Sequence, residues 1–218
     1  MDTVKARKHM LDSQVRPNDV TDHALQAAMG ELPRERFVPA DKRHLAYVER
    51  SVPLFDGRYL LQARDFAKMI DAANVQRSDL VLDVACGYGY SAAVLSRLAS
   101  VVVGVEDDET VVAKASERLA EQGCDNAVMM HNPLTEGCAK QGPYDVIVLA
   151  GGVEDGLTNL LHQLKPDAGR LVTVMMNGRV GRATLFTRAG EAFGERTLFE
   201  CYPPHVLPGF GKKATFTF

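Results

Sequence analysis

The sequence lacks the patterns that would place the chain in a specialised class. Acidic and basic residues nearly balance, with a formal net charge of −3, so no strongly basic surface points to nucleic acid or to an anionic membrane. There is no internal repeat and no apolar run long enough to cross a membrane. The basic residues near the N-terminus are not followed by the apolar core of a signal peptide. We expect a cytoplasmic protein, with no nucleic-acid or membrane partner and a monomer as the favoured state.

The cysteines and histidines do not form a framework for disulfides or metal. None of Cys86, Cys124, Cys138 and Cys201 has CxxC spacing, and the six histidines are scattered. We therefore predict reduced thiols, no disulfide and no metal site.

What the chain does contain is a regular alternation of apolar runs and helical patterns. The apolar runs predict strands at residues 80–84, 101–105, 127–130, 146–149 and 171–176. Between them, Asp108 could cap a helix with an apolar stripe over residues 111–119, and a second stripe over residues 157–164 stops at Pro166. With 218 residues and 46% hydrophobic content, this rhythm indicates an α/β fold built on a doubly wound parallel sheet.

The two flanking regions differ from this central part. Residues 1–75 are predicted to be a mostly helical extension that carries a substrate loop, and residues 76–218 to be the cofactor-binding domain, in one structural unit overall. Strand-like runs at residues 183–188, 196–202 and 214–218 favour an antiparallel C-terminal hairpin. The proline-rich segment 203–210 is either a rigid arm with an exposed Phe210 or a loop before the last strand.

A glycine turn follows the first predicted strand of the sheet. Gly87 and Gly89 let the backbone approach a ligand and expose amide groups at a helix N-terminus. Glu106, which ends the second strand, can accept hydrogen bonds from both hydroxyls of an adenosine ribose. The predicted cofactor-binding residues are Asp83, Ala85, Cys86, Gly87, Tyr88, Gly89, Tyr90, Glu106, Asp107 and Asn132.

The turn alone leaves the cofactor open. Residues 87–92 also fit the GxGxxA fingerprint of a dinucleotide site, or a glycine turn needed only for packing. Asp83 favours S-adenosylmethionine because an acid can face that cofactor's cationic part, whereas it would repel a pyrophosphate. No second mononucleotide-binding half follows, which also favours S-adenosylmethionine. Asn132, after the third strand, either reads the adenine edge or caps a turn.

Over most of its length the chain resembles the protein-L-isoaspartate O-methyltransferases. Residues 32–39 read LPRERFVP beside the family's VPREKFVP, and residues 81–95 follow its VLEIGTGSGYQAAVL. Residues 143–148 and 164–172 follow segments common to many methyltransferases. The resemblance implies a doubly wound, mostly parallel, seven-stranded Rossmann-like methyltransferase sheet with an antiparallel C-terminal hairpin and a helical N-terminal extension. It also implies S-adenosyl-L-methionine as cofactor, S-adenosyl-L-homocysteine as product, and a damaged, isoaspartyl protein or peptide as substrate.

The substrate loop departs from the family pattern. The family's GQTIS is Gly57-Arg58-Tyr59-Leu60-Leu61 here, so that Tyr59 replaces the Thr and Leu61 replaces a Ser that donates to the substrate carboxylate. We take Tyr59 and Leu61 as the candidate catalytic positions, and Arg58, Leu60 and Gln62 as candidate substrate contacts. Arg58 either supplies the missing donor or is a solvated surface charge. Tyr59 either supplies that donor or is a packed side chain. Leu61 is most simply a core residue.

The sequence therefore predicts methyl transfer from S-adenosylmethionine to a carboxylate. Because a free carboxyl is already ionised at neutral pH, the reaction needs no general base and no metal. Two alternatives stay open: the same fold with a different methyl acceptor, and a cofactor-binding protein that no longer catalyses.

Overall fold

Seven strands form one mixed sheet in residues 2–212, the part of the chain that the computed structural model describes. The strand order is β5-β4-β3-β6-β7-β8-β9. The strands are β3 (Leu80–Val84), β4 (Val101–Glu106), β5 (Ala127–His131), β6 (Val146–Val153), β7 (Asp167–Asn177), β8 (Val180–Ala189) and β9 (Ala192–Cys201). The pairs from β5 to β7 are parallel and the last two pairs are antiparallel, which confirms the predicted fold class. The expected strand at residues 214–218 lies outside the described residues.

The sheet is wound outwards in two directions from β3. The chain proceeds from β3 to β4 and β5 on one side, then returns to β6 and β7 on the other. Right-handed crossovers consequently place the two sets of connections on opposite faces. A switch point of this kind opens a crevice at the carboxyl ends of the strands, where ligands bind in open α/β sheets.

Six α-helices accompany the sheet within the described residues: α1 (Thr3–Met10), α2 (His23–Glu31), α3 (Ala63–Ala73), α4 (Tyr90–Ser96), α5 (Glu109–Glu121) and α6 (Thr158–His162). Asp108 caps α5 as predicted, because its side chain accepts from the Thr110 N–H. The apolar stripe at 157–164 produces a shorter helix than expected, since α6 ends at His162. Shorter helical turns lie at Leu11–Val15, Arg16–Asn18, Arg34–Phe37, Ala40–Leu45, Leu134–Glu136 and Ala139–Gln141.

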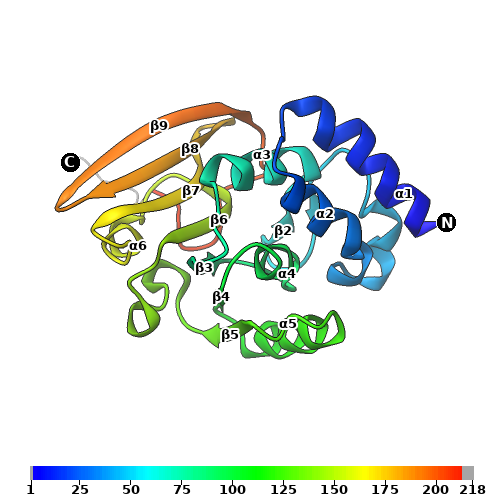
Figure 1. The fold of residues 1–218 in the computed structure, drawn as a ribbon, viewed down its shortest axis with the longest axis horizontal. Coiled ribbons are helices and arrows are strands. Elements are labelled where there is room, and N and C mark those ends of the chain that lie inside the picture. The colour runs from blue at the N-terminus through cyan, green and yellow to red at the C-terminus, as the bar shows by residue number, and fades with distance from the viewer. Residues whose placement is uncertain (1, 213–218) are drawn as a thin grey trace, which may run out of the picture.

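The N-terminal region is mostly helical, as expected, but it also contains a small hairpin that the sequence analysis did not predict. β1 (Val52–Pro53) and β2 (Tyr59–Leu60) pair in antiparallel fashion. The substrate loop begins in the turn between them and continues through β2. Next in the chain, α3 packs on β6 and β7. In Figure 1, α1 and α2 (blue) lie on one side of the molecule, and the long β8–β9 hairpin (orange) lies on the other.

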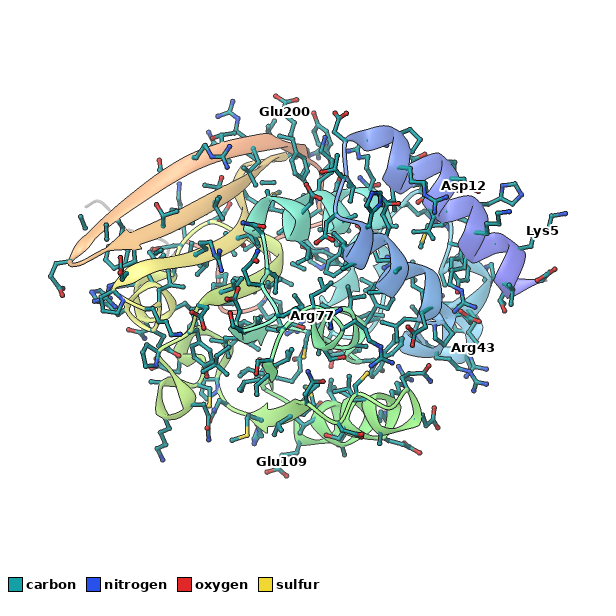
Figure 2. The ribbon with its side chains drawn as sticks, viewed as in Figure 1. Lys5, Asp12, Arg43, Arg77, Glu109 and Glu200 are labelled. Atoms are coloured by element: carbon teal, nitrogen blue, oxygen red, sulfur yellow. The ribbon has the colours of Figure 1, made fainter. Side chains whose placement is uncertain are left out.

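Charged side chains are spread around the molecule. In Figure 2, Lys5 and Asp12 lie together at the N-terminal helices, Glu109 lies at the start of α5 at the lower edge, and Glu200 lies on β9 at the upper edge. This distribution agrees with the mixed charges of the sequence.

The proline-rich segment 203–210 folds back onto the carboxyl end of β6. The Leu207 N–H donates to the Gly152 carbonyl, and the Phe210 carbonyl accepts from the N–H groups of Glu154 and Asp155. Phe210 is fully buried, so the expectation of an exposed Phe210 is wrong: its ring belongs to the hydrophobic core.

Candidate functional site

The glycine turn lies at the switch point, between the end of β3 and the start of α4. Ala85, Gly87 and Gly89 all have positive φ, at 62°, 59° and 91°. A side chain at Gly87 would meet Leu54 of the β1–β2 turn, whose Cδ1 lies 2.7 Å from the position of an added Cβ. Gly87 is therefore required both by its backbone conformation and by the close approach of the substrate loop.

The side chains of this turn divide between core and site. Cys86 is buried, with Sγ 3.8 Å from Met129 Sδ, and the Tyr90 ring is buried against Phe37 and the Arg34 guanidinium. The Tyr88 ring is half-buried and contacts Phe55 of the substrate loop. The predicted contributions of Cys86 and Tyr90 to a ligand are thus limited to their backbone groups.

Asp83 is a fully buried acid on β3, directly before this turn. Neither of its carboxylate oxygens has a hydrogen-bond partner among the described residues. Burial raises the pKa of Asp83 to about 8, and the neighbouring Glu106 acts in the same direction. A cation placed beside Asp83 would favour its ionised form.

Glu106 is also fully buried, and its Oε1 atom is already engaged. It accepts a hydrogen bond from the Gly87 N–H and forms an ion pair with Arg58. The other oxygen, Oε2, has no partner in the described part of the chain. Burial raises the pKa of Glu106 to about 7, against the opposing effect of Arg58.

Arg58 is buried in the site and paired with an acid. Its side chain is only 3% exposed, so the expectation of a solvated surface charge is wrong. Nη2 binds Glu106, and Nη1 lies 3.9 Å from Asp107 Oδ1 with no hydrogen bond of its own among the described groups. This pair could not be predicted from local sequence, because its two members are 48 residues apart.

Tyr59 is buried, and its hydroxyl is used within the fold. It accepts from the Gly152 N–H at 2.8 Å and donates to the His205 carbonyl at 3.0 Å. Burial raises the pKa of the Tyr59 phenol, which keeps it neutral. The packed-side-chain interpretation therefore fits Tyr59 better than the role of a free donor to substrate.

Leu61 and its neighbours are also structural in this arrangement. Leu61 is 2% exposed in the core, and its carbonyl accepts from the buried Arg34. Leu60 is buried, and the Gln62 side chain donates to Asp65 at the start of α3. A hydroxyl introduced at position 61 would enter the core, so the side chain there does not present a donor to an acceptor.

A cavity of about 350 Å³ opens at the carboxyl ends of β4 and β5. Its lining residues are Asp107, His131, Asn132, Pro133, Leu134, Thr135, Pro208 and Gly209. Asn132 is half-buried, and its backbone N–H donates to the Glu106 carbonyl at 3.0 Å. A slightly larger hollow of about 400 Å³ lies on the face of β7–β9, at Met175, Arg182 and Glu195, and includes none of the predicted site residues.

Several residues of the site were not predicted. They include Leu54 and Phe55 from the β1–β2 turn, and Pro208 and Gly209 from the C-terminal segment. The first two had a usable signal, since Asp56-Gly57 between apolar residues is typical of a hairpin turn. The return of residues 208 and 209 to β5 had none, because a proline-rich loop has no periodicity.

Two further observations concern the described residues only. No group of three or more His, Cys, Asp or Glu side chains is arranged to hold a metal ion. None of the helices in residues 2–212 has the length and apolar character needed to span a membrane.

Comparison with known proteins decides the family. The model of the protein-L-isoaspartate(D-aspartate) O-methyltransferase family matches residues 5–200. The chain belongs to this family. A protein-L-isoaspartate O-methyltransferase from Bradyrhizobium sp. is 32% identical over 212 residues, covering 97% of this chain and 98% of the relative. Another, from Opitutus terrae, is 37% identical over 166 residues, covering 76% of this chain and 71% of the relative.

A solved protein-L-isoaspartate O-methyltransferase shares the fold of this chain. The two agree with a TM-score of 0.79 at 23% identity, over 94% of this chain and 67% of the solved one. The family match and these relatives confirm the resemblance predicted from the sequence, and the solved structure confirms the fold.

Proposed function

We propose that the chain is an S-adenosylmethionine-dependent O-methyltransferase that acts on the carboxylate of isoaspartyl residues in damaged proteins or peptides. The observation that carries the proposal is the pair of buried acids, Asp83 and Glu106, on either side of the glycine turn in a chain of this family. The names of the relatives from Bradyrhizobium and Opitutus support the substrate class.

The residues present fit this cofactor in their chemistry. Both oxygens of Asp83 and Oε2 of Glu106 are buried acceptors without a partner in residues 2–212. Asp83 would face the cationic part of the cofactor, and Glu106 its ribose hydroxyls. Asn132 and Asp107, in the 350 Å³ cavity, would contact the adenine. When bound, S-adenosylmethionine supplies a methyl group on a positively charged sulfur, which is already an electrophile.

The task of the protein is then to hold the acceptor and exclude water. An isoaspartyl carboxyl is ionised at neutral pH, so no residue has to remove a proton. Position and orientation provide the catalysis, which requires a donor that binds the carboxylate. Arg58 is the strongest candidate, because its Nη1 has no hydrogen bond among the described groups while the Tyr59 hydroxyl is fully engaged.

A methyl-transfer assay tests the proposal. The chain should transfer label from S-adenosylmethionine to an isoaspartyl peptide and not to the matched aspartyl peptide. Calorimetry should show binding of S-adenosylhomocysteine in preference to NAD. Turnover of neither peptide, with S-adenosylhomocysteine still bound, would contradict the isoaspartyl assignment; binding of NAD alone would contradict the cofactor.

A different methyl acceptor is the second candidate, favoured by one observation. The two positions at which the family carries hydroxyls are occupied here by a buried leucine and an internally bonded tyrosine. Methylation of another carboxylate, with the isoaspartyl peptide inert, would support this alternative. The cytoplasmic location and the monomeric state also stand as proposals, which cell fractionation and light scattering test.

A further inference from the structure

We propose that Arg58 is an internal competitor of the cofactor: it holds the substrate loop closed on Glu106 and leaves that acid only when the cofactor's ribose takes its place. The inference rests on the proposed function and concerns the regulation of the same site. Arg58 thus keeps the loop closed and also couples the binding of the cofactor to the binding of the acceptor.

The substrate loop and the cofactor need the same groups. The Arg58 guanidinium lies on the Glu106 carboxylate, both side chains being at most 3% exposed. Leu54, just before Arg58 in the same hairpin, packs against Gly87, whose N–H donates to the same carboxylate. A ribose that binds through both of its hydroxyls needs both oxygens of Glu106. Because Arg58 occupies Oε1 and only Oε2 is without a partner among the described residues, the loop and the ribose compete for the same carboxylate.

The loop can open without unfolding the site. β1 and β2 are joined by only two residue pairs, and Asp56 and Gly57 at the turn are exposed. Two backbone hydrogen bonds close the turn: the Arg58 N–H donates to the Phe55 carbonyl, and the Leu54 N–H donates to the Arg58 carbonyl. Outside the turn, the Phe55 ring contacts Tyr88, and a His205 ring nitrogen lies 2.6 Å from the Gly57 carbonyl oxygen. Tyr59, directly after the turn, stays anchored by Gly152 and His205.

After its release from Glu106, the Arg58 guanidinium stays close to the site. Arginine stays protonated in proteins, so the displaced charge needs a new partner. The anchored Tyr59 keeps Arg58 beside the site, where Asp107 is the nearest remaining acid, half-exposed and 3.9 Å away in the closed state. A bound acceptor carboxylate offers a second partner within the site. Cofactor and acceptor should therefore strengthen each other's binding through Arg58.

Calorimetry with S-adenosylhomocysteine, which cannot donate a methyl group, tests the competition. Arg58→Gln should bind S-adenosylhomocysteine about tenfold or more tightly than the native chain, because it removes the competing charge. Arg50→Gln, which removes an exposed arginine just before β1, is the matched control and should not change the dissociation constant. Arg58→Lys keeps the charge and should fall between the two.

Two further measurements test the proposal by something other than the affinity of each variant for S-adenosylhomocysteine. An isoaspartyl peptide should tighten S-adenosylhomocysteine binding about fivefold or more in the native chain and leave Arg58→Gln unchanged. Hydrogen exchange at residues 54–58 should become faster when S-adenosylhomocysteine binds, the reverse of ordinary ligand protection. Thermal unfolding of each variant verifies that it is folded.

The outcomes separate this proposal from the proposed function. Unchanged or weaker S-adenosylhomocysteine binding by folded Arg58→Gln, or slower exchange of the loop on binding, would overturn the competition while leaving the methyltransferase assignment intact. A failure of every variant to bind S-adenosylhomocysteine would overturn both.

Discussion

Replacing Tyr59 by Phe removes one oxygen atom from a buried junction of three segments. The hydroxyl connects β2 with Gly152 of β6 and His205 of the C-terminal segment, and its loss leaves a buried N–H and a carbonyl without their partner. An unpaired buried polar group costs about 1–3 kcal/mol. Since His205 is exposed and water can reach its carbonyl, we expect a loss of about 2–4 kcal/mol in the free energy of unfolding.

Urea unfolding measures this loss directly. In a chain of this size it corresponds to a fall in melting temperature of about 5–15 °C. Tyr202→Phe is the matched control, because it removes the same atom from a tyrosine that is 58% exposed and bonded only to Glu200 at 3.0 Å. The control should change stability by less than about 0.5 kcal/mol.

The combination of stability and activity distinguishes the two interpretations of Tyr59. A structural hydroxyl predicts a clear loss of stability in Tyr59→Phe, with the activity of the remaining folded protein less affected. If Tyr59→Phe is as stable as Tyr202→Phe but loses methyl transfer, the hydroxyl binds the acceptor and the structural interpretation is wrong.

Three further predictions concern the glycine turn and its acids. Burial raises the pKa of Asp83 to about 8, whereas an Asp in the unfolded chain has a pKa of about 4. The native chain should therefore lose stability as the pH rises from about 4 to 8, because over this range the folded state binds a proton that the unfolded state has lost. Asp83→Asn lacks this proton, so its stability relative to the native chain should increase over that range and then level off, as measured by urea unfolding at each pH. Glu106→Ala would leave Arg58 buried without its partner. We expect a loss of about 3–5 kcal/mol in the free energy of unfolding, measured in urea, and a native-like stability would contradict this. Gly87→Ala should destabilise more than Gly123→Ala, which has a similar φ of 62° but open space around it, and equal losses in thermal unfolding would show that crowding at the turn is unimportant.

Sequence reasoning succeeded where the signal was local. The strands of the sheet, the Asp108 cap and the position of the glycine turn depend on residues close together in the chain. Within residues 2–212 all three lie where they were predicted, although β6 and β7 are longer than expected. The family motifs extended this to the correct fold class. The placement of Asp83 and Glu106 near each other followed from the rule that parallel strands end at the same edge of a sheet.

The parts that failed depend on contacts between distant residues. Nothing near Arg58 indicates that its charge is neutralised by Glu106, so an exposed location was a reasonable alternative until the fold was known. Phe210 follows a run of prolines, and its burial depends on β6 supplying partners for the backbone around it. The burial of Glu106 at the end of β4 could not be predicted either, because Arg58, which covers it, is 48 residues away in the chain.

The junction at Tyr59 has a consequence for the order in which the site is completed during synthesis. Tyr59 and His205 are 146 residues apart, and His205 also contacts Gly57 of the same turn. While the ribosome is still translating β8 and β9, a nascent chain already carries the glycine turn and both buried acids, but the substrate loop lacks its second anchor. The loop proposed to bind the acceptor is thus completed only after the residues proposed to bind the cofactor have been synthesised, and a message truncated before codon 205 would encode a chain with an incompletely anchored loop.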